Sequence, residues 1–133
     1  MSHDDLHAGP TVGATVLIAE DDRAAREAVA MSLRDAGYTV VETANGAEAL
    51  QQARARGDVA LIVLDMMMPV MDGWEFLAAR KQDPLLRGTP TIVLSDVPAV
   101  HPACQDLPVT VYCAKPFRFD YLTELVRGIL VAS

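Results

Sequence analysis

The feature that most constrains the fold is an apolar run in the middle of the chain, from Val59 to Leu64, which ends abruptly in Asp65. The run has the length of a strand and is polar on neither face, which is typical of a strand buried on both sides of a parallel sheet. In open sheets of this kind, the ligand crevice lies at the carboxyl ends of the strands. A carboxylate at that position is either a turn or capping group or a functional group, and this stretch alone does not choose between them.

Segments with the character of strands and of helices alternate along the rest of the chain. Apolar, strand-like runs are expected at residues 15–19, 38–43, 59–64, 91–94 and 109–114. Apolar residues at helical spacing predict helices at residues 23–36, 46–56, 73–82 and 120–131. Another helix, short or irregular, is expected between the last two strands, where three prolines fall. The alternation predicts an α/β fold, a doubly wound sheet of five parallel strands with about five helices on its two faces.

Polar residues and glycines mark where the predicted helices begin and end. Asp22, Asn45 and Asp72 stand at the start of three of them, where a side-chain oxygen accepts from a free backbone N–H. Gly37 and Gly57 follow two helices, which is typical of a C-terminal cap. For the third helix, the residues expected to face the core are Trp74, Leu77 and Ala78.

Length and composition limit the number of domains and the classes of partner. With 133 residues, 51% of them apolar, the chain can form one domain with its own core, expected at residues 15–133. Residues 1–14 are polar, contain Gly and Pro, and are expected to be a disordered lead-in. A net charge of -7 and the lack of a basic cluster argue against nucleic-acid binding. No membrane-spanning run or signal peptide is recognisable, and Cys113 suits a buried reduced thiol, so we expect a cytoplasmic protein without a membrane partner.

Four of the five predicted strands end in a reactive side chain, which gives the group Glu20 and Asp21, Asp65, Ser95, and Lys115. Because the carboxyl ends of parallel strands share one edge of the sheet, we expect these groups to meet in one crevice. Three clustered carboxylates cannot all ionise without a cation, and Mg²⁺ is a hard divalent cation that prefers oxygen ligands. A lysine and a hydroxyl beside them suit a transferable phosphoryl group, which a carboxylate attacks in line.

Roles can be assigned within this group. Asp65 has no neighbouring acid and follows the central strand, so we assign it as the nucleophile. Asp21 is the expected metal ligand, and Glu20 is expected to be its partner outside the ligands that bind the metal directly. Plainer interpretations exist: Lys115 as a solvated lysine at a strand end, and Ser95 as a turn or helix-capping serine. The joint placement of these residues on strand ends favours phosphoryl chemistry.

Four segments resemble the receiver domain of two-component response regulators: AEDD at 19–22, LDMMMPVMDG at 64–73, VLS at 93–95 and AKPF at 114–117. The resemblance runs from about residue 15 to residue 131, and the spacings between the segments fit it. It implies a flavodoxin-like sheet with strand order 2-1-3-4-5. It also implies a phosphoacceptor module of a two-component or phosphorelay system, which takes phosphate from a phosphohistidine on a sensor histidine kinase or phosphotransfer protein. Such a module signals to a downstream protein, here unknown, through a conformational change at its partner face.

The resemblance further implies roles for single residues. Asp65 accepts the phosphoryl group, and Ser95 and Lys115 contact it. The groups that hold Mg²⁺ are the side chains of Glu20, Asp21 and Asp65 and the backbone carbonyl of Met67. Tyr112 matches the aromatic switch residue, whose ring turns inward when the hydroxyl is drawn to the phosphate. Without the resemblance, Tyr112 would be interpreted as a half-buried strand tyrosine.

Three positions depart from the family pattern. Asp96 follows Ser95 where receivers usually have a small residue, and its charge lies near an incoming phosphoryl group. At an effective dielectric of about 20, a like charge ~6 Å away costs roughly 2–3 kcal/mol before screening, so we expect slower phosphorylation unless Asp96 points to solvent. Met67 and Val97 are apolar where receivers often carry polar residues that position the hydrolytic water. We therefore expect a long-lived acyl phosphate.

Several functions compete for this pattern. The preferred hypothesis is a stand-alone receiver without an output domain, which catalyses only its own phosphorylation and dephosphorylation and is otherwise not an enzyme. The alternative is a degenerate receiver that acts as a phosphorylation-independent binding scaffold, as Asp96 and the proline-rich segment suggest. An aspartyl phosphatase would place a second Asp where Met67 stands. A flavin-binding protein would need a phosphate loop rich in Gly or hydroxyl groups after the first strand, where this chain has acids.

Overall fold

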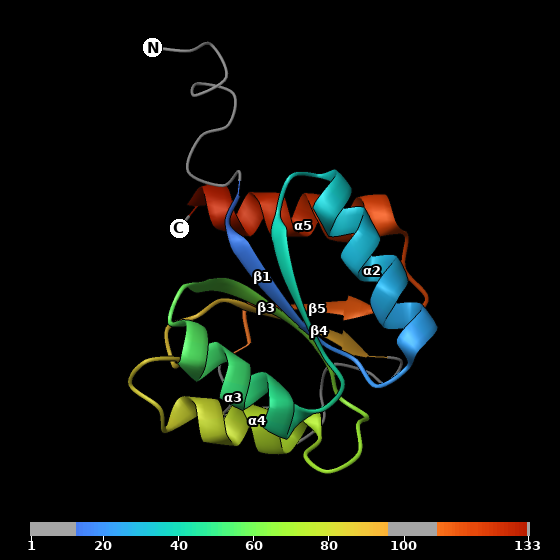
Figure 1. The fold of residues 1–133 in the computed structure, drawn as a ribbon. Helices are drawn as coiled ribbons and strands as arrows, with labels where there is room; N and C mark the ends of the chain where they lie inside the picture. The colour runs from blue at the N-terminus through green and yellow to red at the C-terminus, as the bar shows by residue number, and fades with distance from the viewer. Residues whose placement is uncertain (1–12, 96–108, 133) are drawn as a thin grey trace, which may run out of the picture.

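The computed structural model describes residues 13–95 and 109–132, and the remaining residues lie outside the description. Its strands and helices are β1 (Thr15–Ala19), α2 (Arg23–Asp35), β2 (Thr39–Thr43), α3 (Gly46–Arg56), β3 (Val59–Asp65), α4 (Gly73–Lys81), β4 (Thr91–Ser95), β5 (Val111–Ala114) and α5 (Phe119–Ala132). The five strands form one sheet in the order β2-β1-β3-β4-β5, and every pair is parallel (Figure 1). The predicted α/β fold and strand order are confirmed. The short helix expected between β4 and β5 falls in residues 96–108, outside the described residues.

The sheet separates two hydrophobic cores. Helices α2 and α5 cover one face, and α3 and α4 cover the other (Figure 1). Successive residues of a strand point to opposite faces, so in β3 Leu61 and Val63 enter the first core while Ile62 and Leu64 enter the second. All four side chains are fully buried. This is the two-sided burial that the apolar run of β3 predicts.

The helix caps lie where the sequence places them. The side chain of Asp22 accepts from the N–H of Ala24 (3.1 Å), and that of Asn45 accepts from the N–H of Glu48 (2.9 Å). Asp72 forms a reciprocal capping box with Glu75 at the start of α4. At the other ends, Gly37 and Gly57 have positive φ angles of 101° and 71°. These stops keep the loops short, so the strand ends remain close together at one edge.

The core face of α4 differs from the prediction. Phe76 and Leu77 are fully buried, whereas Trp74 is half-buried and Ala78 is exposed. The buried face continues to Arg80, which is only 3% exposed and donates to the carbonyl of Thr89. An arginine at a core position hides the helical apolar pattern, because its aliphatic stem packs like an apolar side chain while its head finds a polar partner. The prediction was therefore right for Leu77 and for Trp74, which packs against the core while half-buried, and wrong for Ala78, whose expected place is taken by Phe76.

Two smaller expectations can also be compared with the structure. Cys113 on β5 is a free, buried thiol, as its apolar surroundings predict. Within the described ranges, every helix lacks the length and apolar character that a bilayer crossing requires.

Candidate functional site

Three acids, Glu20, Asp21 and Asp22, follow the end of β1 and form what we call the acidic turn. Glu20 is 5% exposed, and its backbone N–H donates to the carbonyl of Thr43 at the end of β2 (3.0 Å). Its side chain turns back, so that Oε2 accepts from the N–H of Asp22 (3.1 Å). Asp21 between them is exposed. The turn thus presents one buried and one exposed carboxylate, while the third acid, Asp22, is occupied as the cap of α2.

Asp65 lies beside this turn, at the end of β3. It is 4% exposed, and its Oδ1 is 3.0 Å from Nζ of Lys115, which reaches in from the end of β5. The same ammonium is 3.8 Å from Oε1 of Glu20. One carboxylate oxygen each of Glu20, Asp21 and Asp65 can be chosen so that all three lie within 4.8 Å of one another. Three strand ends therefore converge on one point, as the sequence predicts.

The end of β4 brings Ser95 to the same edge. Ser95 is buried, pairs in register with Ala114, and its carbonyl accepts from the backbone N–H of Lys115 (2.9 Å). The peptide bond from Lys115 to Pro116 is cis. Because β4 and β5 stay paired to their last residues, the backbone of Lys115 is held in a fixed position. Its 3.0 Å contact with Asp65 thus joins the outer strand to the centre of the sheet.

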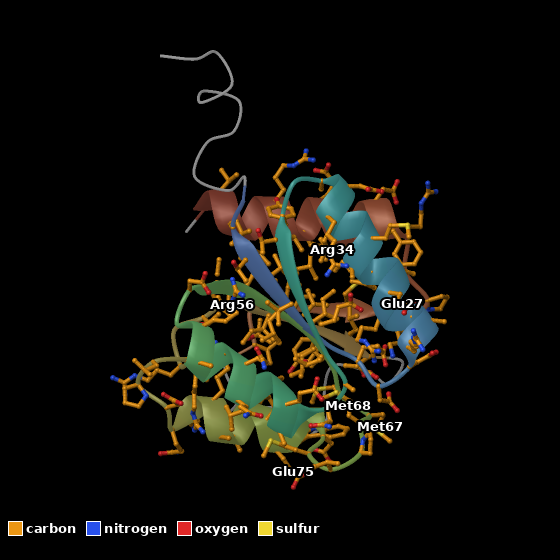
Figure 2. All side chains as sticks on the ribbon, in the orientation of Figure 1. Glu27, Arg34, Arg56, Met67, Met68 and Glu75 are labelled. Atoms are coloured by element: carbon orange, nitrogen blue, oxygen red, sulfur yellow. The ribbon has the colours of Figure 1, made fainter. Side chains whose placement is uncertain are left out.

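The remaining predicted residues lie at the margin of the site or outside the description. The side chain of Met67 is 64% exposed, in the loop between β3 and α4 (Figure 2). Tyr112 is half-buried on β5 and packs against the core beneath α3 and α4. Asp96 and Val97 lie among residues 96–108, so their placement is not described.

A cavity of about 640 Å³ opens over the carboxylates. Its polar wall consists of Glu20, Asp21, Asp22, Asp65 and Lys115, and its apolar wall consists of Ile18, Ala25, Val29, Leu94, Pro116, Phe117 and Phe119, with Met67 at the edge. The volume accommodates a tetrahedral oxyanion together with a hydrated cation. The cavity therefore places the acids and the lysine where a ligand from solvent can reach them.

The electrostatics of the site favour a bound cation. Burial raises the pKa of Glu20 to about 7 from an ordinary 4.5; the N–H of Asp22 opposes the rise, Asp65 adds to it, and Lys115 again opposes it. Lys115 is the only basic residue lining the described cavity, whose wall also carries the four carboxylates of Glu20, Asp21, Asp22 and Asp65. All the acidic groups offer hard oxygen ligands, which fit a divalent cation such as Mg²⁺.

Two glycines hold the loop that follows Asp65. A Cβ at Gly46, the first residue of α3, would lie 2.6 Å from the carbonyl oxygen of Met71, to which the Gly46 N–H donates (2.8 Å). A Cβ at Gly73 would lie 2.7 Å from Cα of Met66, and the Gly73 N–H donates to the Met66 carbonyl (2.9 Å). The loop is therefore closed against both α3 and the end of β3, which fixes the backbone around Met67.

One residue near the site was missed by the sequence analysis. Arg26 on α2 donates from Nη1 to the carbonyl oxygen of Glu20 (3.0 Å), and its Nε is 3.5 Å from Oε1 of Glu42 on β2. The sequence did offer one indication of this contact: Arg26 lies one helical turn after Asp22, on the side of the helix that faces the acidic turn. An arginine at that spacing is common on solvated helix faces, and only the tertiary structure shows that this one reaches the turn.

Comparison with known proteins gives consistent matches. A family model for the response regulator receiver domain matches residues 16–127. The transcriptional regulatory protein HprR of Escherichia coli is 34% identical over 117 residues, which make up 86% of this chain and 51% of that protein. The response regulator MprA of Mycobacterium leprae is 37% identical over 122 residues, or 86% of this chain and 50% of that protein. The chain thus spans about half the length of the curated relatives it matches. The structure of the chemotaxis response regulator CheY4 of Vibrio cholerae matches with a TM-score of 0.80 at 31% identity, covering 87% of this chain and 98% of that one.

Proposed function

Since this chain belongs to the response regulator receiver domain family, we propose that it is a phosphoacceptor module of a two-component or phosphorelay system. The phosphoryl group comes from a phosphohistidine of a sensor histidine kinase or a phosphotransfer protein and is transferred to Asp65. The observation that carries the proposal is the 3.0 Å contact between Lys115 Nζ and Asp65 Oδ1, beside the acidic turn. A buried carboxylate held by an ammonium in an open cavity is well suited to accept an anionic group.

The transfer is an in-line displacement. A carboxylate oxygen of Asp65 attacks phosphorus, the bond from phosphorus to the donor's imidazole nitrogen breaks, and its electron pair stays on that nitrogen. Lys115 is in range to offset the charge of the transferred group. Ser95, at the end of the adjacent strand, is the residue proposed to donate its hydroxyl to a phosphoryl oxygen. These residues supply the positioning and the charge complementarity that this kind of reaction requires.

Mg²⁺, when bound, would supply positive charge that offsets both the carboxylates and the phosphoryl oxygens. The residues that would hold it are Glu20, Asp21 and Asp65, with the backbone carbonyl of Met67. Each of these groups offers oxygen, and the pKa of Glu20 is raised by burial, with the neighbouring Asp65 adding to the rise.

The rest of the proposal concerns signalling and turnover. The protein catalyses only its own phosphorylation and dephosphorylation, acts in the cytoplasm, and passes the signal to a downstream protein. Tyr112, half-buried beside β4, is the proposed switch residue. The exposed thioether of Met67 orients water poorly, which supports a long-lived acyl phosphate.

The test is phosphate uptake from a small phosphodonor with Mg²⁺, measured as acid-stable, base- and hydroxylamine-labile label. The wild type should be labelled once per chain, and Asp65→Asn should not be labelled. Asp58→Asn is the matched control, because Asp58 is an exposed carboxylate that pairs with Arg56 away from the cavity. Equal labelling of Asp65→Asn and the wild type would refute the assignment. An unlabelled wild type would favour the scaffold hypothesis, which no described residue of the site otherwise supports.

A further inference from the structure

We propose that Arg26 is a positioning residue for the acidic turn and its Mg²⁺ ligands, because it holds the peptide unit that joins Glu20 to Asp21. The inference rests on the proposed Mg²⁺ site and assigns a role to a residue outside it. Arg26 Nη1 donates to the Glu20 carbonyl oxygen at 3.0 Å. That carbonyl belongs to a planar peptide, so fixing its direction also fixes the backbone angles on both sides, ψ of Glu20 and φ of Asp21. Those two angles set the relative directions of the Cα–Cβ bonds from which the two carboxylates extend.

The contact completes a clamp on Glu20. The residue's own N–H donates to the Thr43 carbonyl (3.0 Å), so β2 holds it on the amino side. The guanidinium of Arg26 holds it on the carboxyl side. Between these two contacts, the main chain leaves the sheet and makes the turn that presents Asp21. Without the second contact, the peptide between Glu20 and Asp21 would lose its bond to α2, and the bond from the Asp22 N–H to the Glu20 carboxylate would have to hold that carboxylate on its own.

Arg26 is itself fixed in place. Its side chain is 17% exposed, and its Nε faces Oε1 of Glu42 at 3.5 Å. Glu42 also pairs with Arg34, about two turns further along α2, at 3.1 Å, and Arg34 donates to the Val40 carbonyl (3.2 Å). The planar fork of a guanidinium can serve a carboxylate and a carbonyl at once, which the single ammonium of a lysine does poorly. The turn is therefore tied through Arg26 to both α2 and β2.

Whether replacing Arg26 strengthens or weakens Mg²⁺ binding distinguishes a positioning role from a purely electrostatic one. Arg26 carries a positive charge close to a site for a cation, so its charge alone would repel Mg²⁺. If charge were its only effect, replacing Arg26 with a neutral residue would tighten Mg²⁺ binding. If it positions the turn, the same replacement weakens Mg²⁺ binding. A purely structural role would lower the stability of the fold and leave the Mg²⁺ affinity of the folded protein unchanged.

The chain offers a matched control in Arg34. It lies on the same helix (Figure 2), pairs with the same Glu42, and also donates to a backbone carbonyl, but its contacts are with Glu42 and Val40 and not with the acidic turn. Arg26→Gln and Arg34→Gln remove the same charge from the same helix. Arg26→Lys keeps the charge and removes the two-sided contact.

The experiment is a calorimetric Mg²⁺ titration of the wild type and the three variants, each confirmed as folded by urea denaturation. We expect Arg26→Gln to bind Mg²⁺ about tenfold more weakly, the lower range for residues that orient metal ligands, and Arg26→Lys to be weakened in the same direction. Arg34→Gln should bind like the wild type or slightly more tightly. Binding by Arg26→Gln as tight as or tighter than the wild type would overturn the proposal, and Arg26→Lys serves the same purpose if the glutamine variant does not fold.

A second readout is independent of the metal. Amide hydrogen exchange of Asp22 in the metal-free protein reports on the turn, because its N–H donates to Glu20. Exchange should accelerate in Arg26→Gln and remain unchanged in Arg34→Gln, relative to the global stability of each variant. A wild type that does not bind Mg²⁺ refutes the proposed function, and the Asp22 exchange then decides the role of Arg26. Equal exchange in both glutamine variants rejects that role.

Discussion

Raising the pH should destabilise the metal-free protein through one side chain, Glu20. Its pKa is about 7 in the folded protein, chiefly because the carboxyl is buried, against 4.5 for an ordinary glutamate. Between these two values, the folded protein keeps the Glu20 proton and the unfolded chain releases it, so rising pH favours unfolding. The stabilising contribution is complete below pH 4.5 and is lost as the pH rises through 7. At about 1.4 kcal/mol per unit of pH, the full loss is roughly 3 kcal/mol.

Glu20→Gln removes this titration while keeping an oxygen that can accept from the N–H of Asp22. In EDTA, the free energy of unfolding of Glu20→Gln relative to the wild type should therefore rise by roughly 2–3 kcal/mol between about pH 5 and about pH 8. Urea denaturation at a series of pH values measures it, and taking the difference cancels other titrating groups. Glu27→Gln is the control, because Glu27 is an exposed glutamate on α2, outside the cavity (Figure 2).

Added Mg²⁺ should reverse the loss of stability at high pH, which is expected in the wild type and not in Glu20→Gln. At about pH 8 the ionised Glu20 would face a cation, so added Mg²⁺ should recover much of the lost stability, by an amount that grows with Mg²⁺ concentration. Glu20→Gln has one carboxylate fewer and should gain less. The reasoning fails if the difference between Glu20→Gln and the wild type is the same at both ends of the pH range, or if Glu27→Gln shows the same trend.

Two further substitutions test the loop after the phosphoacceptor strand. Gly73→Ala should destabilise the protein by about 2 kcal/mol in urea denaturation, because its Cβ would press on the backbone of Met66, while Gly88→Ala, which has open space, should be close to neutral. A similar cost at both glycines would contradict this. Met67→Asn should shorten the half-life of the acyl phosphate by bringing a polar group that orients water to the cavity edge, whereas Met31→Asn, at an equally exposed methionine on α2, should not change it. Equal half-lives for Met67→Asn and the wild type would count against a role for Met67.

The sequence predicts the fold well because its signals are local and strong. The β3 run is apolar on both faces, so a strand buried between two layers is the consistent interpretation, and the caps Asp22, Asn45 and Asp72 fix where the helices start. Convergence of the reactive residues follows from topology alone, because parallel strands end at one edge. The 3.0 Å contact of Lys115 with Asp65 is consistent with that topology.

The sequence fails where tertiary contacts override local pattern. Arg80 occupies a core position of α4, so the apolar spacing favoured Ala78, which is exposed, in place of Phe76, which is buried. Arg26 was missed for the opposite reason, since an arginine on a helix face carries no local sign of the carbonyl it contacts. In both cases the guanidinium head finds a backbone carbonyl on another segment, and no sequence spacing predicts such a pairing.

Two of the loops that carry site residues, the one after β1 and the one after β3, are held by neighbouring helices. Val70 shows this most clearly: it is a β-branched residue with a φ of 67°, 82% exposed, with the Met71 N–H donating to the Pro69 carbonyl across it (2.7 Å). A valine does not favour that conformation on its own, and the next residue is held from outside the loop, where the Gly46 N–H donates to the Met71 carbonyl (2.8 Å). Arg26 acts on the acidic turn in the same way. The local sequence therefore decides which residues stand at the strand ends, while contacts from α2 and α3 hold the two loops that carry Glu20, Asp21 and Met67.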